Sequence, residues 1–178
     1  MLEDDLHNIY LKLKLYYYRR IFRKIAENEK DTLTALEAFC AEAIYGLGHP
    51  TLTEFANFIN VSQPNAAYKV ANLERKGFVR RIKSTEDLRV SYLEVTDKYM
   101  DIYGSGDRRY AGIIARRIAR RFPEEDVDKL NEILTVVSEE LMREINRYLR
   151  NEPALDEETK IEMSVIPDPA EEAAPEEL

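Results

Sequence analysis

The fold is decided by residues 52–96, which read LTEFANFINVSQPNAAYKVANLERKGFVRRIKSTEDLRVSYLEVT. Two short stretches with helical apolar spacing come first, joined by the tight connection Asn60-Val-Ser62. Gly77 ends the second stretch, and two β-prone runs, Phe78–Lys83 and Arg89–Val95, follow around a polar tip. A short helix, a turn, a second helix and a β-hairpin in this order predict a winged helix-turn-helix.

Local signals set the helix boundaries on both sides of this motif. Thr34 with Glu37, and Thr51 with Glu54, have the spacing of capping boxes and predict two helix starts. Ser62 is expected to cap the second helix of the motif, with a proline in the first turn, where a missing N–H costs little. The side chains expected to face inward from that helix are Ala67, Val70, Ala71 and Leu73.

The outer face of the second helix carries side chains suited to contact DNA. Asn and Gln amides can pair bidentately with adenine, and Lys reaches guanine, so Gln63, Asn65 and Lys69 are candidates for base contacts. Hydroxyl groups bind phosphates, and the remaining outward candidates are Ser62, Tyr68 and Asn72. The alternative is a polar, solvated helix face that needs no partner.

The hairpin favours the DNA interpretation. Lys83 lies before the tip, and Asp87 and Arg89 lie at it, with Arg80 and Arg81 in the first strand. An arginine at a hairpin tip can enter the minor groove, and an acid two residues earlier can pair with it and fix its direction. The alternative is an exposed ion pair that contributes only ~0–1 kcal/mol to stability.

Long amphipathic helices flank the motif. Apolar residues recur at helical spacing from Leu6 to Ile25 and from Leu130 to Tyr148. Gly104-Ser-Gly106 is expected to weaken or kink the helix that follows the hairpin. Arginines later in that helix are expected to pair with acids just after it rather than with DNA phosphates. They are Arg108, Arg109, Arg116, Arg117, Arg120 and Arg121, and the acids are Glu124, Glu125, Asp126 and Asp128.

The net charge of −8 over 178 residues is unevenly distributed. Residues 151–178 hold ten acids and one base, a net charge of −9, whereas residues 1–150 are nearly neutral at +1. The final segment, rich in proline and acid, predicts a disordered acidic tail that aids solubility, or one that competes with DNA for the basic surface. Whole-chain acidity therefore does not argue against a nucleic-acid partner.

Several classes of protein are disfavoured. The sequence has no apolar run near the length of a membrane span and no signal-peptide pattern, so we expect a cytoplasmic protein without a membrane partner. Cys40 is the only cysteine and His7 and His49 the only histidines, so we expect neither a disulfide framework nor a metal site. We expect no enzyme and no cofactor, because phosphate-cradling glycine loops and nucleophile–base spacings are missing.

Five short stretches carry a family resemblance. They are Leu52-Thr-Glu-Phe-Ala56, Val61-Ser-Gln-Pro64, Leu73-Glu-Arg-Lys-Gly-Phe-Val79, Glu86-Asp-Leu-Arg89 and Leu93-Glu-Val-Thr96. In order and spacing this set resembles the multiple-antibiotic-resistance regulator (MarR) family of winged helix-turn-helix transcription regulators. The resemblance implies a mostly α fold with a small β-hairpin wing, comprising a DNA-binding lobe and a helical dimerisation lobe.

The resemblance also implies boundaries for these parts. A MarR-like domain would occupy residues 1–150, with the acidic tail at 151–178 outside it. Within the domain, the dimerisation helices would lie at about 4–28 and 123–150. The DNA-binding lobe would lie at about 33–96 and a linking helix at about 97–122.

The function implied is that of a sequence-specific regulator, a homodimeric repressor that binds a palindromic operator in double-stranded DNA. Many members of the family respond to a ligand between the dimerisation helices and the DNA lobe. In this chain Tyr17 and Arg20 are the candidates to hold a small aromatic or anionic effector, and the alternative for them is packing at a dimer interface. The alternative for the whole chain is a protein-interaction module that has lost specific DNA binding.

Overall fold

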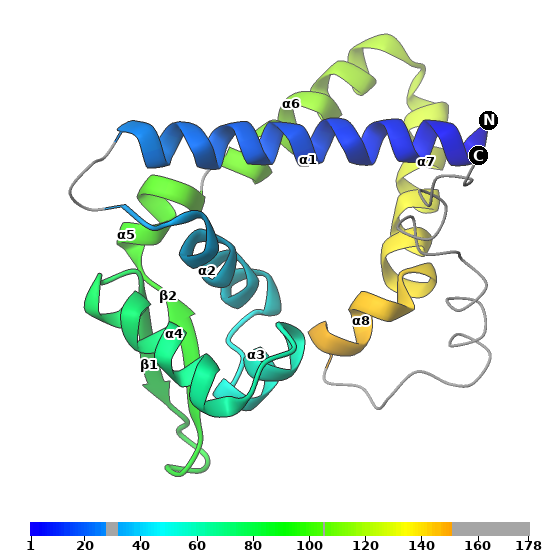
Figure 1. The fold of residues 1–178 in the computed structure, drawn as a ribbon. Helices are drawn as coiled ribbons and strands as arrows, with labels where there is room; N and C mark the ends of the chain where they lie inside the picture. Colours follow the sequence, from blue (N-terminus) through cyan, green and yellow to red (C-terminus); the bar gives the residue numbers. More distant parts are fainter. Residues whose placement is uncertain (28–31, 105, 151–178) are drawn as a thin grey trace, which may run out of the picture. The chain divides into compact units, whose positions relative to one another are not determined.

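The computed structural model of the chain describes residues 1–27, 32–104 and 106–150 (Figure 1). The expected acidic tail lies outside the described residues. The chain divides into two compact units, Met1–Val127 and Asp128–Leu178. No helix in the described part is both long and apolar enough to cross a membrane.

The first unit begins with helices and contains the only two named strands of the described chain. In order they are α1 (Leu2–Glu27), α2 (Ala35–Leu47), α3 (Leu52–Phe58), α4 (Gln63–Arg75), β1 (Val79–Lys83) and β2 (Ser91–Val95). The strands pair antiparallel, from Val79 opposite Val95 to Lys83 opposite Ser91. The mostly α fold with a winged helix-turn-helix is confirmed.

The core of this motif lies where α2, α3, α4 and the hairpin meet. Phe55, Val70, Leu73, Phe78 and Leu93 are each at most 1% exposed. They come from α3, α4 and the hairpin, so the helix pair and the wing share one apolar interior. A shared interior holds the wing rigidly against α4.

Two of the three predicted N-caps form side-chain hydrogen bonds, and the third does not. Thr34 with Glu37 and Thr51 with Glu54 both form complete capping boxes. Ser62 occupies the N-cap position of α4 as expected, but its side chain makes no capping hydrogen bond. Pro64 stands in the first turn as expected.

The predicted inner face of α4 needs a correction of one residue. Ala66, Val70 and Leu73 are buried, whereas Ala67 is half-buried and Ala71 is exposed. The buried positions are spaced at four and three residues, which defines one helix face. Ala67 and Ala71 each lie one residue further along, rotated about 100° away from Ala66 and Val70.

The segment after the hairpin is broken, as the glycines predict. It consists of α5 (Asp97–Tyr99), a π-helix η1 (Met100–Gly104) and α6 (Gly106–Arg121). A π-helical turn changes the register of the faces on either side of it. The helix expected at 97–122 therefore presents different faces before and after Gly104.

The apolar residues of α1 are mostly uncovered. In its 26 residues only Arg20 and Ile21 are buried. Leu6, Ile9 and Leu13 are 55%, 57% and 47% exposed. The amphipathic stripe predicted from sequence is present, but most of its N-terminal half is exposed.

The single helix expected at 123–150 is interrupted. It is divided into α7 (Glu124–Val136), a π-helix η2 (Val137–Leu141) and α8 (Arg143–Leu149). The chain leaves helical geometry at Met142, with φ −93° and ψ 53°. The buried amide of Asn146 donates hydrogen bonds of 2.8 and 3.1 Å to the carbonyl oxygens of Ser138 and Glu139. These bonds satisfy carbonyls that the break would leave unpaired.

Candidate nucleic-acid interface

Helix α4 is fixed at both ends. At its start, Nε2 of Gln63 donates a 2.8 Å hydrogen bond to Oγ1 of Thr53 in α3. At its end, Gly77 adopts a φ of +76°, and the N–H groups of Gly77 and Phe78 bond to the carbonyls of Glu74 and Leu73, a Schellman motif. The bonds at its two ends therefore fix the orientation of α4 relative to the core.

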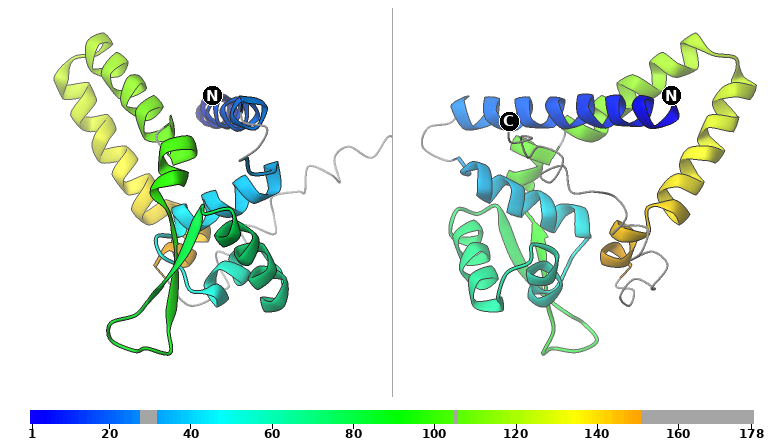
Figure 2. Two further views of the ribbon diagram at one scale, coloured as in Figure 1. Left: turned by 90° about the vertical axis from the view of Figure 1, so that its left-hand side faces the viewer. Right: turned by 45° about the vertical axis from the view of Figure 1, so that its right-hand side comes forward.

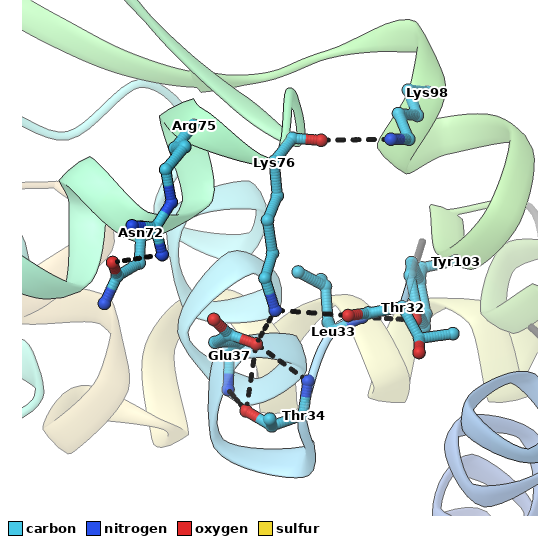
Figure 3. Close-up of polar contacts among 9 residues, drawn as sticks. All are labelled: Thr32, Leu33, Thr34, Glu37, Asn72, Arg75, Lys76, Lys98 and Tyr103. Atoms are coloured by element: carbon cyan, nitrogen blue, oxygen red, sulfur yellow. Dashed lines mark hydrogen bonds and ion pairs between the residues drawn. The ribbon is translucent and has the colours of Figure 1, made fainter. Parts of the chain in front are cut away.

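The Lys76 ammonium joins the C-terminal end of α4 to the N-terminal end of α2 (Figure 3). It donates a 2.6 Å hydrogen bond to Oε2 of Glu37 and a 3.2 Å bond to the Thr32 carbonyl oxygen. Burial opposes ionisation of Glu37, but hydrogen bonds from Lys76 and Thr34 outweigh it, so the pKa of this carboxyl falls below its ordinary value. Lys98 extends the connection by donating a 3.0 Å bond to the Lys76 carbonyl oxygen.

The exposed face of α4 differs in part from the face predicted from the sequence. Pro64, Asn65, Tyr68, Ala71 and Arg75 are exposed, and Tyr68 is 68% exposed. The sequence interpretation left Pro64, Ala71 and Arg75 out of the candidate site. Their spacing from Tyr68, at four, three and seven residues, places them on one helix face and could have identified them.

The other predicted residues of α4 lie around this face. Ser62 and Gln63 are exposed at its start, whereas Lys69 and Asn72 are half-buried at its edge. Oδ1 of Asn72 accepts a 3.0 Å hydrogen bond from Arg75, which leaves the amide donors of Asn72 available (Figure 3).

The wing is attached along the second strand. The Leu93 N–H donates a 2.7 Å hydrogen bond to the Pro50 carbonyl oxygen, and Thr51 forms a bridge with Tyr92. Figures 1 and 2 show the hairpin extending beyond α3 and α4. The tip therefore projects from a base that is bonded to the segment before α3.

Two of the wing arginines are paired with acids. Nε of Arg80 lies 2.6 Å from a carboxylate oxygen of Glu94 on the opposite strand, and Nε of Arg81 lies 3.2 Å from one of Glu74 in α4. These pairs reduce the positive charge of the first strand. Lys83 and Arg89 are exposed, and neither forms an ion pair within the described part of the chain.

The tip is organised by its own polar side chains. Oγ of Ser84 accepts hydrogen bonds of 3.2 Å from the N–H groups of Glu86 and Asp87. Oδ1 of Asp87 accepts a 2.9 Å bond from the Arg89 N–H. The expected ion pair between Asp87 and the Arg89 guanidinium is thus replaced by a bond to the backbone, as Asp commonly makes in turns. The acid shapes the loop, and the guanidinium extends from it.

The two candidate effector residues, Tyr17 and Arg20, do not line the same cavity. Arg20 lines a cavity of about 590 Å³ between α1, η1 and the start of α6. Tyr17 is not among the lining residues and packs instead beside Phe39 of α2, with 6.2 Å between the ring centroids. The Arg20 guanidinium lies 5.7 Å from the centroid of the Tyr17 ring, so the two are neighbours but do not face one cavity.

The arginines of α6 do not form the expected local ion pairs. None of Arg109, Arg116, Arg117, Arg120 and Arg121 pairs with an acid among the described residues. The prediction is wrong for these five because the helix ends at Arg121 and a new one begins at Glu124. The side chain of Arg108 lies outside the described residues.

The remaining sequence predictions concern the reactivity of Cys40 and the absence of a metal site. Burial raises the pKa of the Cys40 thiol, which disfavours the reactive thiolate. Among the residues that the structure describes, no three His, Cys, Asp or Glu side chains form a group suited to a metal ion.

Comparison with known proteins shows what the region of this site resembles. Residues 33–91 match the model of the MarR family. No curated protein matches the chain. The transcriptional regulator Tm0710 from Thermotoga maritima is similar in structure, with 21% identity, a TM-score of 0.55, and coverage of 77% of this chain and 94% of that one.

Two further structures show the same fold. A mutant of MepR from a multidrug-resistant S. aureus clinical isolate has 14% identity and a TM-score of 0.55, covering 80% of this chain and 98% of that one. A MarR family protein from Bacillus stearothermophilus has 18% identity and a TM-score of 0.53, covering 79% and 92%. The resemblance is confirmed over residues 33–91, which match the model of the MarR family, and these solved structures share the fold of the chain.

Proposed function

We propose that this protein is a homodimeric, sequence-specific repressor that binds a palindromic operator through α4 and the hairpin. The observation that carries the proposal is the pairing of two surfaces on one rigid lobe. These are the exposed face of α4 around Tyr68 and the Arg89 guanidinium at a preformed tip. A helix of this size fits the major groove, while the tip reaches the adjacent minor groove.

The residues of α4 divide by what their side chains can bind. Asn65 is exposed with its amide available, and Gln63 keeps Oε1 as an acceptor while its amide bonds to Thr53. Together with Lys69 they supply base contacts, and Ala71 adds a methyl group suited to thymine. Ser62, Tyr68 and Asn72, with Lys83 of the wing, bind phosphates and position the helix.

The uncovered apolar faces of α1 and α7 support the proposed dimer. Leu6, Ile9 and Leu13 of α1, and Ile133 and Leu134 of α7, are between 47% and 57% exposed. Helices with apolar stripes bury them against a partner, and a second copy of the chain supplies one. A two-fold dimer would place two α4 helices on half-sites about 34–36 Å apart, one turn of DNA.

The proposal includes release by a small ligand bound beside Arg20. Ligand binding that favours one arrangement of the linking segment over another would change operator affinity. The π-helix between the wing and α6 is the segment whose geometry such a ligand would alter.

The decisive experiment is selection from a random DNA library with the full chain at two salt concentrations. We expect a palindromic consensus whose enrichment falls at high salt, because phosphate contacts release counterions. Failure to enrich any sequence at either salt concentration would contradict the proposal.

Arg89→Ala tests the wing on the selected operator, with Arg81→Ala as the matched control. We expect Arg89→Ala to weaken binding at least several-fold, with no loss of folding. Arg81→Ala removes the same charge from an arginine already paired with Glu74, so we expect a smaller loss. Equal affinities for the two variants in fluorescence anisotropy would contradict the role of Arg89.

Asn65→Ala and Lys69→Ala test base recognition. A base contact changes which sequences are preferred, whereas a phosphate contact weakens binding uniformly. We expect the selected consensus to relax at one position in each half-site while the dimer persists. An unchanged preference over a panel of operators would remove these residues from the base-reading set.

A second candidate function is a protein-interaction module on the same fold. The ion pairs of Arg80 and Arg81 favour it, because they withdraw two charges from the wing. Such a module would bind neither selected nor random DNA and would show no salt dependence, so a salt titration separates it from the repressor.

A further inference from the structure

The apex of the wing is a β-turn formed by Asp87, Leu88, Arg89 and Val90. The Val90 N–H donates a 2.9 Å hydrogen bond to the Asp87 carbonyl oxygen, which closes the turn. Oδ1 of Asp87 accepts a second 2.9 Å bond from the Arg89 N–H. Leu88 and Arg89 are therefore the two central residues of the turn. They belong to the loop of the hairpin that extends beyond α3 and α4 (Figures 1 and 2).

Leu88 is an apolar residue at a position where the described chain gives it little cover. It is 72% exposed, and among the described residues only Met1 and Leu2 are large apolar residues with a greater exposure. Turns favour Gly, Pro, Asn, Asp and Ser, so the turn itself does not require a leucine. A single exposed leucine is ordinary on a protein surface. This leucine is distinguished by its place beside Arg89, at the corner of the proposed DNA-binding wing.

The loop that carries Leu88 has no net charge. Residues 83–90 contain one lysine and one arginine together with one glutamate and one aspartate. The two acids offset the attraction of the two cations for phosphates, so charge alone gives this loop little affinity for DNA. Burial of an apolar side chain is a source of affinity that does not depend on charge. Leu88 is the large apolar side chain that this loop exposes.

The loop backbone is held by its own hydrogen bonds. Oγ of Ser84 accepts 3.2 Å bonds from the N–H groups of Glu86 and Asp87. The Ser84 N–H donates a 3.0 Å bond to the Val90 carbonyl oxygen on the other side of the loop. Separating two stacked base pairs requires free energy. A loop that is bonded to itself keeps its shape when a side chain at its corner meets that resistance.

We infer that Leu88 inserts between two neighbouring base pairs from the minor groove, beside Arg89, and that the wing thereby kinks the operator. Leucine is one of the apolar side chains with which minor-groove proteins separate base pairs, and the duplex then bends by about 20–90°. The steps that open most easily are TA and CA/TG, so the operator should carry one of them where the wing binds. The inference rests on the proposed function, because it describes how the same wing engages DNA.

The test uses the full chain and duplexes of its selected operator. 2-Aminopurine, whose fluorescence rises when the base is unstacked, replaces one purine at a time, and energy transfer between dyes at the duplex ends reports bending. We expect the fluorescence to rise at one step in each half-site and the dyes to move closer together. Binding with neither change would overturn the insertion and leave the proposed function intact. Failure to bind the selected operator would contradict both.

Leu88→Gln and Leu88→Met form a matched pair of variants. Both side chains are unbranched and of similar length, but only methionine is apolar. Leu88→Gln should weaken operator binding at least about five-fold and abolish the rise in 2-aminopurine fluorescence, whereas Leu88→Met should retain most of both. Circular dichroism checks that each variant is folded. A Leu88→Gln variant that binds and unstacks the operator like the wild type would overturn the inference.

The salt dependence of binding separates an apolar contact from a contact made by a charge. Leu88→Gln removes no charge, so its loss of affinity should be the same at every salt concentration. Arg89→Ala removes a cation and should make the dependence on salt less steep. A Leu88→Gln variant whose loss of affinity disappears at low salt would mean that the residue acts through the charges of the loop, which would overturn the insertion.

A change in the DNA locates the step. Replacing the flexible step at the wing by the stiff AA step of an A-tract should weaken binding of the wild type more than binding of Leu88→Gln, which no longer pays for opening that step. The same replacement at the centre of the operator should affect the two proteins equally. Equal losses at the wing step would mean that Leu88 does not act there, and the inference would fail.

Discussion

The winged-helix lobe and helix α1 carry similar amphipathic patterns, but only the lobe covers its own apolar face. In the lobe, Phe55, Phe78 and Leu93 are at most 1% exposed, and both capping boxes are complete. In α1, two residues of 26 are buried. The apolar face of the lobe is therefore covered within the chain, whereas most of the apolar face of α1 is exposed among the described residues.

The largest expected difference comes from one phenylalanine substitution in each region. Phe55→Ala should lower the free energy of unfolding by about 3–5 kcal/mol, because it leaves a cavity in a closed core. Phe22→Ala in α1 removes the same group from a side chain that is 63% exposed, and should cost much less. Urea unfolding followed by circular dichroism measures both, and similar losses would refute the contrast.

Leucine-to-glutamate changes test what covers α1. Leu13→Glu should weaken dimerisation by about 2 kcal/mol or more, since it buries a charge in the proposed interface. Leu88→Glu changes a leucine that is 72% exposed at the wing tip and should leave the dimer intact. Sedimentation equilibrium gives both dissociation constants. A Leu13→Glu variant as dimeric as the wild type would exclude this face from the interface.

Glu37→Gln tests the connection between α2 and α4. Loss of the charged contact with Lys76 should cost about 1–3 kcal/mol of stability at neutral pH. The pKa of Glu37 is lower in the folded chain, so its contribution is present above the ordinary value of 4.5 and is lost as the pH falls through the folded value. The difference between wild type and variant should therefore shrink in acid. A pH-independent difference in urea titrations would contradict this origin.

Cys40→Ala should have the smallest effect. The thiol is buried and its pKa is raised, so it behaves as a small apolar group rather than as a redox sensor. We expect a loss of about 1 kcal/mol and unchanged DNA affinity, with or without peroxide. Peroxide sensitivity that disappears in the variant would contradict this interpretation.

The sequence predicted what depends on neighbours in the chain. Both capping boxes, the order of helices and the hairpin follow from spacing over three to ten residues, and the family model matches the same region. Ala71 was expected to be buried. The buried face of α4 lies one residue away from the predicted one, so Ala71 is exposed. Helical spacing predicts that a helix has an apolar face more reliably than it predicts which residue lies at the centre of that face.

The errors concern competition among side chains that sequence spacing cannot resolve. Asp87 was expected to pair with the Arg89 guanidinium, but the backbone N–H is closer and completes a turn. Arg81 pairs with Glu74 across two elements, and Asn146 bonds carbonyls freed by a break at Met142. Such contacts exist only once the elements have been packed.

The hairpin tip has a consequence for the kinetics of association. Ser84 and Asp87 bond the loop to itself, so in the proposed complex its backbone would need no rearrangement before contact with a groove. A loop that is already ordered loses little conformational entropy when it binds. The association rate is then limited by diffusion and orientation of the two surfaces rather than by a slow conformational change of the loop.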